Sequence, residues 1–565
     1  MNDTDQEAVV RNNLAAEDPL VVAHDRDVQW DDEADVVVVG FGGAGASAAL
    51  EAHECGADVL VIERFKGGGS TAFSGGVYYA GGTQFQRDAG YEDTAKDMFD
   101  YLCLERKDAV SEDTLLRFCE QSAENTNWLV KHGVGFEGSL YTGKISYPPE
   151  GKHLYFSGNE KVPAFSAKAR PAPRGHRTLG KGLTGYAFFG ALKNSVMRST
   201  IRVQNHSRAV RLVVDDSGAV IGVETFEITR LKDQKKHQKL YAIVVPTNSF
   251  NSANANQAIK ESLAFERQVG VRKLIRVYGG LILATGGFSY NADMLRKHMP
   301  SLADRTDAMM RLGSMGCSGD GIRLGVSVGG AVRGLDRSYL GRQIAPPAAL
   351  LQGLIVNRQG KRFINEDAYS GVVGEAIRQQ PNGDAWMIID KQLYRAMLMQ
   401  CLPSGDGGFK NFKLPTLLNL FFGGTKRDPT LGGLASKIGV DPVGLKNSVA
   451  SMHHEIEHGE PDPLGKNSDY RKLLGAGPYW ALNTSISNRF AFFAFFTLGG
   501  LQLDEQSGSV LGDNGAVIKG LYAAGRAAIG IPSDIYLSGL SLADCVFSGR
   551  RAGRSAAVIG LSARE

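Results

Sequence analysis

The stretch Asp35-Val-Val-Val-Val-Gly40-Phe-Gly42-Gly43-Ala-Gly45 decides the fold of this chain. Its consecutive valines are β-branched and apolar, which predicts a buried parallel strand. The glycines that follow have the spacing G-x-G-x-x-G. In that pattern Gly40 allows a tight turn, Gly42 lets a pyrophosphate approach the backbone, and Gly45 lets a helix pack against the strand. The helix predicted over residues 44–55 would offer the pyrophosphate free N–H groups and the positive end of its dipole.

A second predicted strand, at residues 58–62, ends at Glu63. An acidic residue at this point, about twenty residues past the glycines, suits the two hydroxyls of an adenosine ribose. A Gly-rich turn in an ordinary α/β protein would explain the glycines but not Glu63. The order of strand, helix, strand and acid therefore predicts a dinucleotide-binding site.

The composition narrows the class of protein. A chain of 565 residues exceeds one ordinary core, so we expect two or more domains. The apolar content of 43% and charged content of 22% are typical of globular proteins. A net charge of +3 is too small to indicate nucleic-acid binding. The acidic N-terminus does not resemble a signal peptide, and no stretch is long and apolar enough to span a membrane.

The six cysteines are scattered and form no C-x-x-C pair. This spacing argues against a zinc site, an iron–sulfur cluster, an attached c-type haem and a disulfide framework. We therefore expect no metal, and reduced thiols in a cytoplasmic protein.

Two segments stand apart from the dinucleotide-binding pattern. Residues 230–275 combine clustered lysines with a run rich in Ser and Asn, and look like an insertion in a β-meander. We interpret them as a solvated surface excursion; the alternative is a basic patch that meets anionic lipid. The apolar run at residues 414–422 indicates either core packing or a hydrophobic entrance for a lipid-like substrate.

Taken in order, the motifs resemble those of the flavoprotein family of fumarate reductases and 3-ketosteroid dehydrogenases, over about residues 33–560. Besides the fingerprint at 35–63, the motifs that carry this resemblance are Ala284-Thr-Gly-Gly-Phe288, Gly319-Asp-Gly-Ile-Arg-Leu-Gly325, Arg362-Phe-Ile-Asn-Glu366, Thr497-Leu-Gly-Gly-Leu501, Gly520-Leu-Tyr-Ala-Ala-Gly525 and Ser541-Leu-Ala-Asp-Cys545. Together they are specific for the family, whereas each alone is weak.

The resemblance implies an α/β fold with an α+β catalytic insertion. A Rossmann-type FAD-binding domain, made from both ends of the chain, would enclose the inserted catalytic domain, with the active site at the flavin ring. The bounds that follow are 1–30 for a polar N-terminal extension, 31–328 and 491–565 for the FAD-binding domain, and 329–490 for the catalytic domain.

The resemblance also implies which residues contact FAD. They are Gly40, Gly42, Gly43, Ala44, Gly45, Glu63, Arg64, Gly69, Ser70, Thr71, Ser74, Gly75, Gly76, Ala209, Val210, Ala284, Thr285, Gly286, Asp320, Gly525, Arg526, Ser541 and Leu542. The final predicted helix, from Ser541 to about Ile559, would direct its N-terminus at the pyrimidine end of the flavin, where the reduced flavin carries negative charge.

Departures from the family pattern are informative about chemistry. Gly69 stands where members with covalent FAD have a His, so we expect non-covalent FAD. Phe495 and Phe496 replace a His pair of the fumarate reductases, and Tyr536 lies in the stretch where those enzymes have a carboxylate-gripping Arg. Burying a dicarboxylate without such partners costs several kcal/mol. We therefore expect an apolar, neutral substrate with a carbonyl group.

The motif Tyr536-x-Ser538-Gly539 resembles that of 3-ketosteroid 4-dehydrogenases. The Tyr followed by a Pro/Gly run that 1-dehydrogenases favour is absent. Tyr369 and Tyr479 resemble the other active-site tyrosines of these enzymes; the alternative for each is a half-buried packing phenol. These hydroxyls are the predicted catalytic groups, with a chain Tyr536–Ser538–Tyr369 as a proton relay, and which of them is the base stays open.

The resemblance thus implies an FAD-dependent dehydrogenase that forms the 4,5 double bond of a 3-ketosteroid. Such a reaction needs a polarised carbonyl, a base for the α proton and the flavin N5 as hydride acceptor. The alternatives are a 3-ketosteroid 1-dehydrogenase, a fumarate-reductase-like reductase of an unsaturated acid, and a flavin-binding protein without turnover. The expected partners are a steroid, an unknown electron acceptor and the surface of a membrane, but no nucleic acid.

Overall fold

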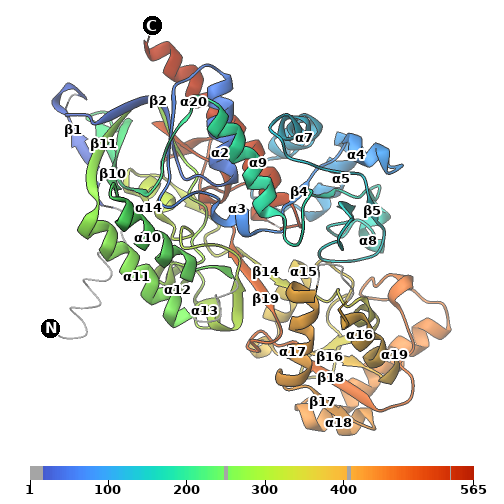
Figure 1. The fold of residues 1–565 in the computed structure, drawn as a ribbon. Helices are drawn as coiled ribbons and strands as arrows, with labels where there is room; N and C mark the ends of the chain where they lie inside the picture. Colours follow the sequence, from blue (N-terminus) through green and yellow to red (C-terminus); the bar gives the residue numbers. More distant parts are fainter. Residues whose placement is uncertain (1–16, 24, 247–251, 404–408, 535, 565) are drawn as a thin grey trace, which may run out of the picture.

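The computed structural model describes residues 17–23, 25–246, 252–403, 409–534 and 536–564 (Figure 1). The fingerprint forms the strand β2 (Asp32–Val39), the helix α2 (Gly43–Glu54) and the strand β3 (Val59–Ile62). The valines of β2 are 0–4% exposed, because β2 lies between β11 and β3 and the helices α2 and α20 pack on it. The strand–helix–strand unit predicted from the sequence is therefore confirmed.

The unit belongs to a nine-stranded mixed sheet. Its strands, in spatial order, are β1 (Leu20–Val22), β9 (Ser207–Asp215), β10 (Val220–Glu227), β11 (Val271–Leu283), β2, β3 and β8 (Arg202–Gln204), with β22 (Val517–Ala523) on β11 and β21 (Ser509–Leu511) on β22. The strands β8, β3, β2, β11 and β22 run parallel, whereas β9, β10 and β11 form an antiparallel meander. The long β11 belongs to both parts, so it joins the meander to the nucleotide-binding half.

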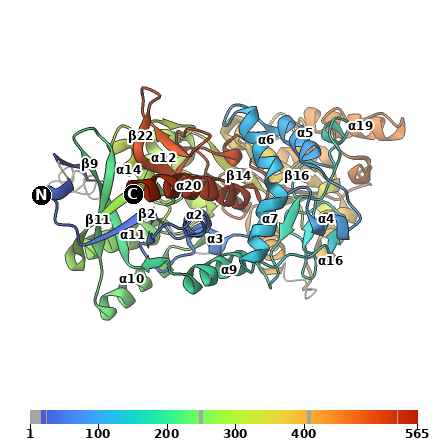
Figure 2. The same ribbon diagram turned by 90° about the horizontal axis from the view of Figure 1, so that it is seen from above.

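The last helix, α20 (Leu540–Arg564), lies beside α2, as Figures 1 and 2 show. Glycines of α20 face the α2 backbone: a Cβ on Gly549 would lie 2.6 Å from the carbonyl oxygen of Ala44, and one on Gly553 would lie 2.3 Å from that of Ala48. Only glycine permits this approach. The two ends of the chain thus form one domain, as the family resemblance implies.

Among the described residues, four smaller sheets lie outside the nine-stranded one, and the smallest pairs β13 (Val332–Arg333) with β20 (Gly500–Leu501). One four-stranded sheet has the order β4 (Val77–Tyr79), β7 (Gly175–Arg177), β6 (Leu154–Tyr155), β5 (Leu140–Tyr141). The three-stranded sheet has the order β12 (Met309–Arg311), β19 (Phe493–Thr497), β14 (Ser338–Arg342). The other four-stranded sheet has the order β15 (Leu354–Val356), β16 (Trp386–Ile389), β18 (Tyr479–Asn483), β17 (Lys426–Asp428). The mixed α/β class with an α+β part is confirmed by these sheets.

The helices that accompany these sheets fall into two groups along the chain. The first group is α4 (Gln84–Asp88), α5 (Ala95–Glu105), α6 (Glu112–Glu120), α7 (Ser122–Lys131), α8 (Pro163–Ser166) and α9 (Gly185–Arg198). The second group is α15 (Ser370–Arg378), α16 (Lys391–Cys401), α17 (Leu414–Phe422), α18 (Leu431–Ile438) and α19 (Pro442–Glu457). The second group lies at the lower end of the molecule in Figure 1, around the sheet of β15 to β18.

A separate hydrophobic core lies in this lower part. It begins at Phe288, earlier than the predicted catalytic domain, and includes Phe493 and Phe495, which lie after it. The catalytic domain bounds of 329–490 stay a prediction, since the core they should enclose extends on both sides through the sheet of β12, β19 and β14.

An insertion does interrupt the meander, as predicted for residues 230–275; it covers residues 228–270, between β10 and β11, whereas residues 271–275 belong to β11. However, the interpretation as a solvated excursion is wrong. The insertion folds into α10 (Leu231–Ile243) and α11 (Ser252–Val269), which pack on each other. Tyr241 and Glu266 are buried against the body of the protein. Part of its Ser/Asn-rich run lies outside the described residues.

The apolar run at 414–422 forms α17, which is only partly in the core. Leu420 packs into the lower core, whereas Phe421 and Phe422 are each 67% exposed. Among the described residues, no helix combines the length and the apolar character that crossing a bilayer requires.

The close contact between α2 and the turn that follows β2 can be tested by substitution. A Cβ on Gly45 would lie 1.9 Å from the carbonyl oxygen of Gly40, whereas a Cβ on Gly42 would meet no atom closer than 3.7 Å. We expect Gly45→Ala to lower the thermal midpoint of the apoprotein clearly, because the turn cannot close. Gly42→Ala should leave that midpoint nearly unchanged but reduce FAD retention. Equal midpoints for the two apoproteins, measured by circular dichroism, would contradict this account.

Candidate active site

A cavity opens where parallel strands of the large sheet end. The residues that directly follow β2, β3, β11 and β22 and line the cavity are Gly40, Glu63, Ala284 and Ala524. Open α/β sheets bind their ligands in this position, outside the carboxyl ends of the strands. Cys545, from the first turns of α20, also lines the cavity. The last helix therefore reaches the cavity through Cys545, and that its N-terminus points at the flavin stays a prediction.

Most of the residues predicted to contact FAD line this cavity. They are Gly40, Gly42, Gly43, Ala44, Glu63, Arg64, Gly69, Ser70, Thr71, Ala209, Ala284, Thr285, Gly286, Asp320 and Arg526. The predicted residues that do not line it are Gly45, Ser74, Gly75, Gly76, Val210, Gly525, Ser541 and Leu542.

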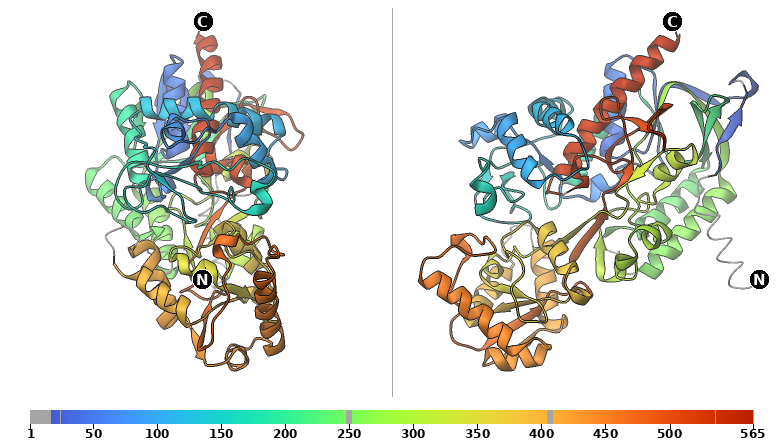
Figure 3. Two further views of the ribbon diagram at one scale, coloured as in Figure 1. Left: turned by 90° about the vertical axis from the view of Figure 1, so that its right-hand side faces the viewer. Right: turned by 180° about the vertical axis from the view of Figure 1, so that it is seen from behind.

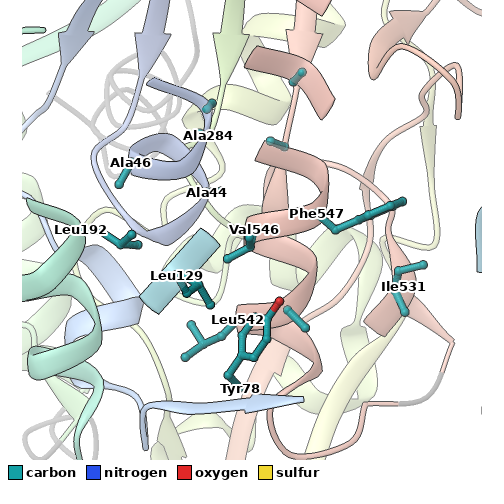
Figure 4. Close-up of a cluster of buried hydrophobic side chains, with 14 of the residues drawn as sticks. Ala44, Ala46, Tyr78, Leu129, Leu192, Ala284, Ile531, Leu542, Val546 and Phe547 are labelled. Atoms are coloured by element: carbon teal, nitrogen blue, oxygen red, sulfur yellow. The ribbon is translucent and has the colours of Figure 1, made fainter. Parts of the chain in front are cut away.

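Local geometry explains several of these exceptions. Val210 follows Ala209 on β9, and successive residues of a strand face opposite sides. Gly45 packs under the turn rather than into the cavity. The side chain of Leu542 is 6% exposed and packs beside Tyr78 in the apolar cluster between α20 and β4, as Figure 4 shows.

The sequence alone did not identify other residues of the cavity wall. These are Ser207, Arg208, Tyr241, Ser314 and Cys317, together with Val39, Phe41, Ile62, Phe65, Gly316, Leu324, Ala524 and Cys545. Arg208 and Ser207 precede the predicted Ala209 on the same strand, which is a signal that could have been used. Tyr241 belongs to the inserted helix α10, and only the packing of α10 brings it to the cavity.

The cavity fits an FAD nucleotide. The carboxylate of Glu63 accepts hydrogen bonds from the backbone N–H groups of Phe41 (2.8 Å) and Phe65 (2.7 Å), which fix its orientation at the end of β3. Burial raises the pKa of Glu63. Within the described part of the chain, Arg64 Nη1 and Ser207 Oγ are buried and make no hydrogen bond. Such donors point to a ligand with oxygen acceptors.

Gly69 has a left-handed backbone conformation (φ 46°) and no side chain to attack a flavin ring. The hydroxyl of the neighbouring Ser70 lies 2.9 Å from the Sγ atom of Cys317, a residue far away in the sequence. Arg64, Ser207 and Glu63 would thus hold FAD through hydrogen bonds and charge, without a covalent link.

Beyond the cavity lies an aromatic cluster formed by Tyr339, Tyr369, Phe496 and Tyr536. The ring of Tyr536 lies 4.8 Å from those of Tyr339 and Phe496 and 6.5 Å from that of Tyr369, measured between centroids. The guanidinium of Arg526, which lines the FAD cavity, lies 4.7 Å from the ring of Phe496. The cluster is therefore next to the cofactor site.

The predicted tyrosines divide into two groups. Tyr369 and Tyr536 meet in the cluster, as expected. Tyr479 does not join it: it lies on β18, opposite Asp428 of β17, and packs against the lower core. Of the phenylalanine pair, only Phe496 faces the cluster, whereas Phe495 points into the lower core, as alternation along β19 requires. Tyr339 was not identified from the sequence, where a lone Tyr on a strand carries no motif.

The hydroxyl groups around the cluster are hydrogen bonded. Tyr339 pairs with Ser370 at 2.9 Å, and Ser538 pairs with Tyr155 at 2.9 Å. The predicted relay from Ser538 to Tyr369 is not observed: in the described part of the chain no hydrogen bond joins them, and Tyr155, on β6, takes that place. Burial raises the pKa of Tyr155, Tyr339, Tyr369 and Tyr536, so these phenols are protonated at neutral pH.

Comparison with known proteins agrees with this site. The chain matches the family model of the FAD binding domain over residues 35–539. It is 37% identical, over 88% of its length and 93% of the relative's, to a 3-oxo-5-alpha-steroid 4-dehydrogenase of Comamonas testosteroni. A solved 3-ketosteroid-delta4-(5alpha)-dehydrogenase from Rhodococcus jostii, in complex with 4-androstene-3,17-dione, is 30% identical with a TM-score of 0.78; the match covers 96% of this chain and all of that one.

A more distant structure shares the fold. The 3-ketosteroid delta1-dehydrogenase of Sterolibacterium denitrificans is 19% identical with a TM-score of 0.64, over 94% of this chain and all of that one.

Proposed function

Since this chain belongs to the FAD-binding-domain family of flavoproteins, we propose that it catalyses the FAD-dependent desaturation of a 3-ketosteroid, forming the 4,5 double bond. The observation that carries the proposal is the aromatic cluster beside the FAD cavity. It consists of the rings of Tyr339, Tyr369, Phe496 and Tyr536, whose aromatic surface suits a flat apolar molecule. The 37% identity to a steroid 4-dehydrogenase supports the same substrate class.

The hydroxyls of the cluster suit this chemistry because they are neutral donors. Removing a proton next to a ketone requires stabilisation of the charge that develops on the carbonyl oxygen. The protonated phenols of Tyr536 and Tyr369 can donate hydrogen bonds to that oxygen in a dry pocket, where such bonds are strong. When bound, FAD supplies the hydride acceptor.

The α proton needs a path away from the substrate. Ser538 is two residues from Tyr536, and its hydroxyl is hydrogen bonded to that of Tyr155. A hydroxyl pair can accept a proton on one side as it releases one on the other. We therefore assign the pair Ser538–Tyr155 to proton transfer, and Tyr536 and Tyr369 to polarisation of the carbonyl.

The other functions have less support. A 1-dehydrogenase shares the fold, but its solved relative is only 19% identical. For a reductase of an unsaturated dicarboxylate, the four rings of the cluster offer the carboxylates no positive charge, and the neighbouring Arg526 already lies over Phe496. A flavin-binding protein without turnover would need no ordered set of hydroxyls; anaerobic bleaching of the flavin by a steroid would exclude it.

The substrate class can be tested by product identification. We expect saturated 3-ketosteroids, incubated with the holoenzyme and an artificial electron acceptor, to yield the 4-ene product, with both ring fusions offered separately. Fumarate should not be reduced by the enzyme with a reduced viologen dye, since the four rings of the cluster bring no positive charge to a dicarboxylate. Formation of a 1-ene, or turnover of fumarate, would contradict the proposal.

The role of Tyr536 can be tested by removing its hydroxyl. Tyr536→Phe keeps the ring packing, so FAD content should stay full and a 3-ketosteroid should still bind. Losing one donor to a developing oxyanion typically costs about a hundred- to a thousandfold in turnover, and we expect a loss on this scale in kcat.

Tyr479→Phe is the matched control, because Tyr479 lies outside the cluster; its kcat should stay within about twofold of the wild type. Ser538→Ala should lose turnover and alter the pH dependence of kcat, since it interrupts the contact with Tyr155. Near wild-type turnover of Tyr536→Phe would show that Tyr536 is a packing residue.

We also propose that the enzyme takes its substrate at a membrane surface. The helices α9, α10 and α17 lie on the side nearest the viewer in Figure 1, and Figure 3 (left) places them along one edge. The exposed Phe421 and Phe422 of α17 would enter the interface, and anionic lipid would attract the lysines of α10. These exposed lysines are Lys232, Lys235, Lys236 and Lys239.

Vesicle sedimentation tests this surface. We expect the wild-type protein to sediment with vesicles containing phosphatidylserine, and Phe421→Ser/Phe422→Ser to bind at least about tenfold more weakly, because two large apolar side chains are lost. Val558→Ser removes an equally exposed apolar residue from α20 and should bind as the wild type does. Unchanged binding of the double variant would contradict the assignment of α17.

A further inference from the structure

The inserted helices α10 and α11 are not needed to complete the sheet. They connect β10 to β11, which are antiparallel neighbours whose ends, Glu227 and Val271, are paired. A two-residue turn can join such strands. The chain instead uses residues 228–270, whose helices α10 and α11 bring Tyr241 to the wall of the FAD cavity and Glu266 to Arg64.

The insertion places a buried carboxylate among cations. Glu266 of α11 is 1% exposed, and its Oε1 atom lies 2.8 Å from Arg64 Nε and 2.8 Å from His237 Nε2. Its Oε2 atom lies 3.7 Å from Arg208 Nη1. Burial alone would raise the pKa of Glu266, but these neighbours outweigh it and lower the pKa to about 2. A buried ion is tolerated only where partners compensate its desolvation, so the carboxylate, the two arginines and His237 form one unit.

The unit fixes the orientation of Arg64. Two of its nitrogens, Nε and Nη2, donate to Glu266 at 2.8 and 3.3 Å. The third, Nη1, is buried and makes no hydrogen bond; it lies 3.6 Å from Asp320 Oδ2, and Arg64 and Asp320 both line the cavity. Because a guanidinium presents its donors in a rigid planar fork, holding one edge on Glu266 directs the remaining nitrogen.

The other inserted helix contributes to the wall itself. His237, between Glu266 and His206, stacks on the ring of Phe65 with centroids 4.7 Å apart. Tyr241, one turn further along α10, lines the cavity, and its ring centroid lies 4.5 Å from that of Phe65. Phe65 follows Arg64 in sequence, so α10 packs on one residue of the segment after β3 and α11 pairs with the other.

We propose that the inserted helices α10 and α11 form a clasp on the nucleotide half of FAD, in which Glu266 positions Arg64 to bind the cofactor and Tyr241 closes the cavity wall. The clasp determines how tightly FAD is retained, and this role is independent of the substrate that the enzyme desaturates. Glu266 is a positioning residue here, because it acts on FAD only through Arg64.

The test is the dissociation constant of FAD. The apoprotein of Glu266→Gln should bind FAD about ten- to a hundredfold more weakly than that of the wild type, since a charged hydrogen bond that holds Arg64 is weakened. Binding is measured by quenching of flavin fluorescence on titration. Glu261→Gln makes the same change in charge on the exposed face of α11 and should bind FAD as the wild type does.

A second measurement separates this role from a purely structural one. The thermal midpoint of each apoprotein and holoprotein is recorded; the stabilisation that FAD adds should fall in Glu266→Gln and stay unchanged in Glu261→Gln. If Glu266→Gln does not fold, Arg64→Lys keeps the charge but loses the fork, and should weaken FAD binding similarly. Wild-type affinity for FAD in Glu266→Gln, or an equal loss in Glu261→Gln, would overturn the proposal.

Discussion

The approach of α2 to the end of β2 is the constraint on which the rest of the structure depends. Gly45 lies against the carbonyl group of Gly40 so closely that no side chain fits between them. This contact aims the free N–H groups of α2 at the cavity, where the dipole favours a pyrophosphate. Because α20 then packs on α2 through its own glycines, the position of α2 also determines where the last helix begins, and with it the motif around Tyr536.

The two ends of the site are built on opposite electrostatic principles. Around Tyr536 the side chains are aromatic or hydroxylic, and burial keeps the phenols protonated. A neutral ketone gains hydrogen bonds there without the cost of burying an ion. At the other end, Glu266 and Asp320 alternate with arginines, including Arg64, in a buried cluster of charges. A charged cluster of this kind suits an anionic nucleotide, whose phosphates bring charge of their own.

The inserted helices and α17 show how one chain can add functions to a common scaffold. Both segments lie outside the strand–helix–strand pattern, and their burial is uneven: Tyr241 of α10 faces the cavity, whereas the lysines of the same helix face solvent. A helix can serve an internal site and a surface at once because its faces repeat every 3.6 residues. On α17 the two faces differ in the same way: Leu420 is buried, whereas Phe421 is exposed.

The sequence by itself determined the nucleotide-binding unit, most of the cavity-lining residues, and the apolar character of the substrate site. These features are local: glycine spacing, strand runs and short motifs such as that at Tyr536 require only neighbours in the chain. The tertiary structure alone decided that Tyr339 joins the aromatic cluster, that Ser538 pairs with Tyr155, and that Tyr479 lies elsewhere. It also decided that Glu266, far from the fingerprint in sequence, reaches Arg64. Such contacts arise where separate elements pack, and the periodicity of a single segment carries no information about its partner.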